Sequence, residues 1–352
     1  MNLASNLLDE PGLAKVLIEK KLITRRAFVA GDVRLTLADR RNRNAKITIA
    51  GADGLFAKQA KTQEALGTIR KEAEMLKFLA GVHDDLSDYL PRQICFDEEL
   101  CLLVTGLIPD GRSLQYILTQ GDLGLGHAAA AGVILANLHK RSMRHDDRSA
   151  KLPPPILALN NPHASLLGNL SPANMQLIEA IQSDHELSAG MDRLRADWRL
   201  TSMIHGDAKW DNMVVAPGAF VLVDWELATI GDPRWDVGTV FSSFFSAWIA
   251  SMPMAFGAGG DLMMRESQLS IDKLRPTARM FWLSYKGVSE LGSLNFFRDE
   301  AMAYCAGRLI QTAFEYMQDA ARLTANAIYM IQMAANILRD PRRVAELLLG
   351  TR

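Results

Sequence analysis

The sequence predicts an α+β chain made of two lobes, a small antiparallel sheet followed by a larger and mainly helical part. Three observations favour this class. The chain has 352 residues, more than the roughly 250–300 over which a single hydrophobic core usually grows. Segments in which apolar and polar residues alternate, the strand pattern, gather before residue 105, whereas helical spacing dominates after it. The predicted division is therefore residues 1–104 and residues 105–352.

The first lobe is predicted to open with a short amphipathic helix within residues 1–30. Three strands, a helix and two further strands should follow, because each alternating run is bounded by polar or glycine-containing turns. Gly81 provides a stop for the helix. The predicted strands are 32–37, 45–49, 54–58, 92–96 and 100–104, and the helix covers about 68–79.

The second lobe is predicted to contain helices over 126–139, 172–183 and 276–349. Ser171 and Pro172 form an N-cap followed by proline at the first helical position. The segment 151–162 holds three consecutive prolines and is expected to be extended. Two short apolar runs, 213–215 and 220–223, predict a hairpin.

The uncharged segment 237–260 is long enough to be weighed as a membrane span. It contains four serines, four glycines and a proline, so a buried helix that ends near Pro253 is the preferred interpretation.

Composition excludes several classes of protein. Lys plus Arg number 39 and Asp plus Glu 40, a formal charge of −1, which argues against a nucleic-acid binder. The three cysteines, Cys95, Cys101 and Cys305, fit neither a zinc pattern nor an even disulfide framework. The first residues lack the apolar core of a signal peptide. We therefore expect a cytoplasmic protein without nucleic-acid or membrane partners.

The most informative stretch runs from His205 to Asn212 and is followed by Asp224, Trp225 and Glu226. Asp207, Asn212 and Asp224 supply two carboxylates and one carboxamide, and the predicted hairpin would bring the last two close together. Magnesium prefers such oxygen ligands. Phosphoryl transfer needs an aligned attacking oxygen and cations that neutralise the phosphoryl charge. This pattern predicts magnesium-dependent phosphoryl transfer to a hydroxyl group.

On these motifs the sequence resembles the aminoglycoside phosphotransferase and choline kinase-like family, a branch of the protein-kinase-like fold. The family motif His-Gly-Asp-x-x-x-x-Asn matches at 205–212 and the metal-binding motif at 224–226, and the resemblance covers roughly residues 25–340. It implies that Asp207 orients and deprotonates the acceptor hydroxyl, and that Asn212 and Asp224 bind magnesium. The alternative is that Asp207 caps a turn and the other two are hairpin-turn residues.

The same resemblance implies ATP as cofactor, with GTP as the alternative nucleotide. Lys58 occupies the strand position whose ammonium meets the α- and β-phosphates, and it is preferred to Lys61. Its expected acidic partner on the next helix is Glu72, with Glu74 as the alternative. Backbone groups of Thr105 to Leu107 would contact adenine, so residues 1–104 are expected to be the nucleotide-binding lobe and 105–352 the catalytic and acceptor-binding lobe.

Two positions depart from an ordinary family member. The turn that should cover the phosphates, 39–44, has no glycine, so Arg40, Asn42 and Asn44 are expected to contact phosphate instead. A solvated turn, or one that recruits an acidic substrate, remains open. Lys209 stands where eukaryotic-type Ser/Thr kinases place a lysine on the γ-phosphoryl group, and we expect it to act in catalysis; a solvent-exposed lysine is the alternative.

By the same resemblance His205 is a packing residue and Asp236 braces the motif loop. The acceptor is expected to be a small-molecule alcohol, with Glu226, Asp232, Glu290 and Glu300 as candidates for an acidic pocket. Local motifs also resemble the kinases of ribosomal-peptide biosynthesis of the lanthipeptide or thioamitide type. These phosphorylate Ser or Thr of a precursor peptide and act with a partner lyase. A nucleotide-binding pseudokinase scaffold is the third hypothesis.

Overall fold

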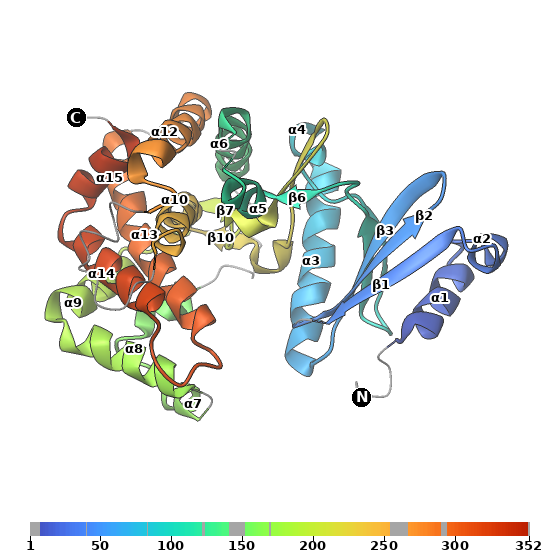
Figure 1. Ribbon diagram of the computed structural model, residues 1–352, viewed down its shortest axis with the longest axis horizontal. Coiled ribbons are helices and arrows are strands. Elements are labelled where there is room, and N and C mark those ends of the chain that lie inside the picture. The colour runs from blue at the N-terminus through green and yellow to red at the C-terminus, as the bar shows by residue number, and fades with distance from the viewer. Residues whose placement is uncertain are drawn as a thin grey trace. The chain divides into compact units, whose positions relative to one another are not determined.

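The computed structural model describes residues 8–39, 41–82, 84–121, 124–140, 152–168, 170–253, 267–289 and 294–350. The chain divides into two compact units, and each is built from two stretches of sequence. Unit 1 comprises Met1–Arg112 and Val214–Ala228, and unit 2 comprises Ser113–Met213 and Thr229–Arg352. The sheet and most strands belong to unit 1 and most helices to unit 2 (Figure 1). The predicted fold class is confirmed, whereas the split after residue 104 and the role of each lobe remain predictions.

Unit 1 is built around a five-stranded antiparallel sheet of order β1-β2-β3-β5-β4. The predicted order of three strands, a helix and two strands is confirmed, and the helix α3 is longer than predicted. The elements are α1 (Glu10–Glu19), α2 (Arg25–Val29), β1 (Val33–Asp39), β2 (Arg43–Ile49), β3 (Ala52–Gln59), α3 (Gln63–Val82), α4 (Asp84–Ser87), β4 (Gln93–Asp97), β5 (Leu102–Gly106), β9 (Ala219–Leu222) and the 3-10 turn η4 (Trp225–Leu227).

The two faces of this sheet carry different residues. Ala45 and Ile47 of β2, together with Ala57 of β3, are buried in one cluster with Leu13 and Leu17 of α1. Side chains alternate along a strand, so Lys58 lies on the opposite face from its neighbour Ala57. Figure 1 shows α1 and α3 on opposite sides of the sheet. The face that carries Lys58 is therefore the face covered by α3.

Unit 2 is a helical assembly in which α6 packs on α12, and α10 and α14 pack on α13. Its elements are α5 (Leu114–Thr119), α6 (Leu125–His139), η2 (Pro155–Ala158), α7 (Ala164–Leu167), α8 (Pro172–Ser183), α9 (His185–Ala196), β7 (Ser202–Ile204), η3 (Trp210–Asn212), β10 (Thr229–Gly231), α10 (Pro233–Ala250), α12 (Ile271–Val288), α13 (Leu294–Tyr316), α14 (Ala325–Arg339) and α15 (Pro341–Leu349). Strand β6 (Arg112–Ser113) joins a small sheet with β8 (Met213–Ala216) and β9.

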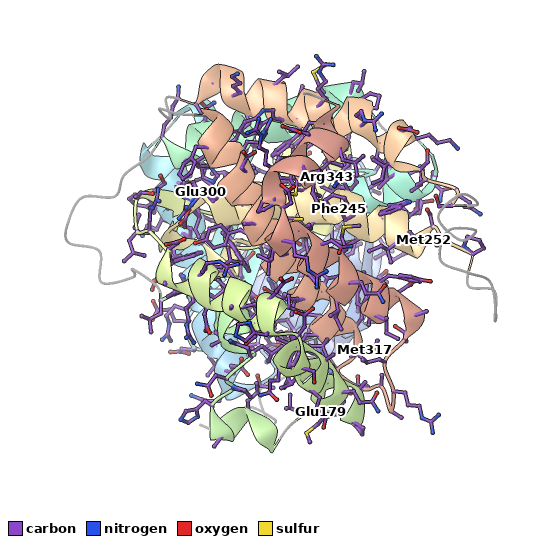
Figure 2. All side chains as sticks on the ribbon, turned by 90° about the vertical axis from the view of Figure 1, so that its left-hand side faces the viewer. Glu179, Phe245, Met252, Glu300, Met317 and Arg343 are labelled. Atoms are coloured by element: carbon purple, nitrogen blue, oxygen red, sulfur yellow. The ribbon has the colours of Figure 1, made fainter. Side chains whose placement is uncertain are left out.

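Aromatic side chains fill much of the core of unit 2. Phe241 of α10 makes edge-on contact with Phe281 of α12, and Tyr285 stacks on Phe297 of α13. Phe245, labelled in Figure 2, lies among these helices and is fully buried. The helices that carry the site residues therefore have a rigid common core.

The proline-rich segment 151–162 was expected to be extended, and this is wrong for its central part. Pro155 opens the 3-10 turn η2, because the fixed φ of proline suits the first position of a helical turn, where its missing N–H is not needed. Residue 151 lies outside the described part of the chain.

The predicted buried helix in 237–260 corresponds to α10, which begins at Pro233 and ends at Ala250; residues 254–260 lie outside the described part. Within the described residues, no helix combines the length and apolar character required to cross a membrane.

Candidate active site

Three of the predicted residues meet in unit 1. The ammonium of Lys58 on β3 lies 2.7 Å from Glu72 Oε2 on α3 and 2.5 Å from Asp224 Oδ1, just after β9. We call these three residues the lysine cluster. Glu74, the alternative partner, is exposed. The alternation in β3 places Lys58 beneath α3, and this explains why Glu72 is the acid that reaches it.

Burial and charge oppose each other in the lysine cluster. Burial disfavours the ammonium of Lys58, but the carboxylates of Glu72 and Asp224 outweigh it and raise the pKa of Lys58. Burial raises the pKa of Glu72, against the opposing effect of Lys58. Lys58 therefore stays charged at neutral pH, the state that phosphate binding would require.

Asp224 has a left-handed backbone conformation, with φ 68° and ψ 58°. Aspartate tolerates this region better than most residues, and such conformations concentrate at functional sites. The indole of Trp225 donates to the carbonyl of Leu222 at 2.7 Å, which ties the turn to the end of β9. About one third of the Asp224 side chain is exposed, so a ligand can reach this carboxylate.

The glycine-free turn between β1 and β2 is anchored by Arg41, a residue that the sequence reasoning did not select. Its guanidinium lies 2.8 Å from Glu226 Oε1 and 3.5 Å from Glu64 Oε1. Asn42 is buried, Asn44 stands opposite Lys58 in the β2–β3 ladder, and both side-chain oxygens lack a hydrogen-bond partner among the described residues. Arg40 lies outside the described residues.

The predicted adenine-contact segment, Thr105 to Leu107, ends β5. Thr105 is buried. The N–H of Gly106 donates to the carbonyl of Arg92 at 2.8 Å, and that of Leu107 to the carbonyl of Gly54 at 2.9 Å. These two N–H groups are therefore already used within unit 1.

Unit 2 holds the second group of site residues, on the loop that follows β7. The carboxylate of Asp207 accepts hydrogen bonds at both oxygens. Lys209 Nζ and Asn212 Nδ2 lie 2.9 and 3.0 Å from Oδ2, and Arg308 Nη2 of α13 lies 2.7 Å from Oδ1. We call Asp207, Lys209, Asn212 and Arg308 the aspartate cluster.

Cations dominate the electrostatics of the aspartate cluster. Burial disfavours the charged carboxylate, but Arg308 and then Lys209 outweigh it and hold the pKa of Asp207 below its ordinary value. Burial likewise opposes the charge of Lys209, while Asp207 and then Glu315 raise its pKa. At neutral pH Asp207 is a carboxylate, ready to accept a hydrogen bond from a hydroxyl group.

Asp236 of α10 fixes the backbone at the start of the loop. Its two oxygens accept the N–H groups of His205 at 2.7 Å and Gly206 at 2.9 Å. His139 Nε2 lies 3.2 Å from Asp236 Oδ2. Gly206 has φ 82°, a conformation that side chains disfavour, so glycine is required at the sharp bend before Asp207. This geometry agrees with the bracing role that was expected of Asp236.

Asn212 in unit 2 and Asp224 in unit 1 each offer an oxygen atom of the kind that binds magnesium. The Nδ2 atom of Asn212 also donates to the Asp207 carbonyl at 2.9 Å, so its amide oxygen is the atom left for a cation. Asp224 contributes a carboxylate oxygen beside the one that meets Lys58. Hard oxygen donors of this kind suit magnesium, which takes its other ligands from phosphate and water.

The acidic residues considered for an acceptor pocket are paired with arginines. Glu226 forms an ion pair with Arg41 of the β1–β2 turn. Asp232 caps α10 and forms an ion pair with Arg234, whose Nη1 lies 2.9 Å from Glu300 Oε2. The charge of these acids is already balanced, so they give a cationic acceptor no specific support. Glu290 lies outside the described residues.

Arg308 is the site residue with the weakest signal in the sequence. It is 101 positions from Asp207 in the chain, and an arginine within a helical pattern is ordinarily a surface residue. Helical phase offered a weak signal, because Arg308 falls between Cys305 and Leu309 on the buried side of α13.

Comparison with known families and structures supports the kinase-like reading of this geometry. The model of the phosphotransferase enzyme family matches residues 32–268, more than half of the chain. A search of curated proteins finds no match.

Solved structures of similar fold include two choline kinase relatives and one antibiotic complex. A choline/ethanolamine kinase family protein from Mesorhizobium loti is 16% identical (TM-score 0.56; 96% of this chain and 98% of that chain covered). A choline kinase from Cryptosporidium parvum is 11% identical (TM-score 0.58; 96% and 99%). APH(2″)-IIa, solved as a ternary complex with streptomycin and ATP, is 12% identical (TM-score 0.54; 94% and 99%). At these identities the likeness concerns the fold.

Proposed function

Because the chain belongs to the phosphotransferase enzyme family, we propose that it transfers the γ-phosphoryl group of ATP to the hydroxyl group of a small-molecule alcohol. Its class, a phosphotransferase with an alcohol group as acceptor, follows from the family. The nucleotide, the metal and the size of the acceptor are the proposed part. The observation that carries the proposal is that the chain retains both the lysine cluster and the aspartate cluster, each assembled within one unit.

In the proposed reaction the lysine cluster serves the nucleotide. Lys58 binds the α- and β-phosphates, and Glu72 holds its ammonium in place. Asn42, Asn44 and Arg40 are the candidates for the remaining phosphate contacts, and Thr105 to Leu107 for the adenine edge. Asn212 and Asp224 would hold magnesium, which neutralises charge on the phosphoryl oxygens when bound.

The aspartate cluster serves the acceptor. Asp207 accepts a hydrogen bond from the hydroxyl and takes its proton as the oxygen attacks the γ-phosphorus. The bond between that phosphorus and the β-phosphate oxygen breaks, and ADP leaves. Lys209 stabilises the charge that develops on the phosphoryl group. A low pKa keeps Asp207 ionised, so its main contribution is alignment together with partial proton transfer.

The family match favours a small-molecule acceptor over a peptide. Because the acidic residues are paired with arginines, they do not indicate whether the acceptor is charged. The alternative of a precursor-peptide substrate with a partner lyase, and that of a pseudokinase scaffold, have no specific support among the described residues.

The test is magnesium-dependent loss of γ-phosphate from ATP, compared with GTP, in the presence of a panel of alcohols and a Ser/Thr-containing peptide. We expect a phosphorylated alcohol. Asp207→Asn should reduce turnover roughly 10²–10⁴-fold, the range for losing general-base assistance, while nucleotide still binds. Undiminished turnover in the variant contradicts the role of Asp207, and product formed from the peptide alone contradicts the small-molecule acceptor.

A further inference from the structure

Arg308 is a buried cation in the helical core of unit 2. Only 1% of the residue is exposed. Its Nη2 meets Asp207, its guanidinium carbon lies 5.3 Å from the centre of the Trp235 ring, and its Nε and Nη1 atoms lack hydrogen-bond partners among the described residues. Burying a charge with unpartnered N–H groups is unfavourable, and an apolar side chain of similar volume would pack there at lower cost. Packing alone therefore does not explain an arginine at this position.

The hydrogen bonds of Asp207 show what Arg308 contributes. A carboxylate offers about four lone-pair positions. Arg308 occupies one on Oδ1, while Lys209 and Asn212 occupy two on Oδ2. Contacts at both oxygens prevent the carboxylate from rotating about its bond to Cβ. About one position remains, enough for a single hydroxyl group.

Two of these three contacts have other duties in the proposed reaction. Lys209 would turn to the transferred phosphoryl group, and Asn212 holds magnesium through its amide oxygen. Arg308 is the one of the three for which no contact with phosphate or magnesium is proposed. We propose that Arg308 is a positioning residue that holds the Asp207 carboxylate so that its open lone pair faces the acceptor hydroxyl. This inference rests on the proposed function and assigns that reaction a residue outside the matched region 32–268.

The test compares Arg308→Met, which removes the charge and the hydrogen bond at similar volume, with Arg308→Lys, which keeps the charge. Arg298→Met is the matched control. Arg298 is another buried arginine of α13, and its guanidinium pairs with Asp299. Each variant is assayed for magnesium-dependent release of γ-phosphate from ATP with water as the acceptor. Nucleotide affinity is measured separately by calorimetric titration.

We expect Arg308→Met to lower kcat by up to about 10²-fold, the effect of misplacing a reacting group by about 1 Å. Its nucleotide Kd should stay within about twofold of wild type, since Arg308 makes no proposed nucleotide contact. Arg308→Lys should restore part of the rate, because an ammonium can still donate to Oδ1. Arg298→Met should match wild type.

Three results overturn the inference: a wild-type kcat in folded Arg308→Met, an equal loss in Arg298→Met, or a loss confined to nucleotide affinity. If Arg308→Met does not fold, Arg308→Leu, which also removes the charge and the hydrogen bond, decides, and an unchanged kcat in that variant overturns the role. Asp207→Asn distinguishes a failure of the positioning role of Arg308 from a failure of the proposed function. If it loses turnover while Arg308→Met does not, only the positioning role is wrong. If wild type releases no γ-phosphate to water or to any alcohol, the proposed function fails and the inference with it.

Discussion

At the scale of single residues, Glu72 is the group whose replacement tests the lysine cluster. Glu72→Gln removes the charge that meets Lys58 while Asp224 stays in place. A hydrogen bond to a charged group contributes about 1.5–3 kcal/mol, so nucleotide affinity should fall about tenfold or more. Glu74→Gln, exposed and two positions away on the same helix, is the control. Titration with a non-hydrolysable ATP analogue measures both; equal affinities in the two variants would contradict the pairing.

Lys209 is predicted to act on the rate of the reaction. Its ammonium lies 2.9 Å from Asp207 Oδ2, and about one third of its side chain is exposed, so the proposed contact with a phosphoryl group is sterically open to it. Lys209→Ala should lower kcat more than it raises the KM for ATP, because an interaction that strengthens in the transition state affects kcat. Steady-state kinetics at varied ATP measure this. An effect seen only in KM would show that the ammonium binds substrate and transition state equally well.

Part of this site was predictable from the sequence, and two of its arginines were not. The family resemblance, through the position of the third strand and the register of the helix after it, was enough to prefer Lys58 to Lys61 and Glu72 to Glu74. The contact between Arg308 and Asp207 has no local signature, because it depends on how α13 packs against the loop after β7. Arg41 was also missed, since a run of arginines in a turn looks the same whether it is solvated or paired with Glu226.

At the scale of secondary-structure elements, the close packing of α6 on α12 is the feature most open to test. A Cβ added at Gly132 would clash with the carbonyl oxygen of Phe281 and lie 2.8 Å from the amide nitrogen of Tyr285. Backbone atoms cannot move aside as a flexible side chain can. Gly132→Ala should therefore lower the free energy of unfolding by about 1–3 kcal/mol, the usual result of overpacking.

Gly126→Ala is the control for this prediction, because it lies in the same helix and nothing is within 4 Å of its added Cβ. It should be neutral or stabilise by up to about 1 kcal/mol, the difference in helix propensity. Urea unfolding followed by circular dichroism measures both variants. Similar midpoints for the two would mean that α6 and α12 are less closely packed than described.

Elements with a strong local pattern were predictable and those set by context were not. The strands of the sheet and the capped start of α8 at Ser171 follow from alternation and capping. Helix α9 was missed, although Leu187, Met191 and Leu194 are buried at helical spacing. Pro276 was expected near the start of a helix, but α12 begins at Ile271 and includes it, because a buried apolar face stabilises the turn that precedes the proline.

At the scale of the whole molecule, ligand binding should be visible as added stability that depends on the metal. A ligand that binds only the folded state stabilises it by about 2.7 kcal/mol at a hundred times its Kd. We expect an ATP analogue with magnesium to raise the Tm clearly, and the analogue with a chelator to raise it less, because Asp224 would lose the cation that links it to phosphate. Calorimetric scans measure this. An equal rise with and without magnesium would contradict the metal role of Asn212 and Asp224.

The path of the chain through the two units depends on more than length and local pattern. The sequence placed the hairpin after Asn212 in the second lobe, whereas residues 214–228 belong to unit 1. Local patterns predict that β8 and β9 form a hairpin. They do not predict which core the hairpin joins, because that depends on packing between segments far apart in the sequence, such as α3 and η4.

The origin of Arg308 in α13 has a consequence for recombination between relatives. The family-defining stretch ends at residue 268, yet a side chain encoded well downstream touches the motif aspartate. A chimera that exchanges only the C-terminal helices would keep every signature used to recognise the enzyme while replacing the counter-ion of Asp207. Splice points for such hybrids therefore belong after α13.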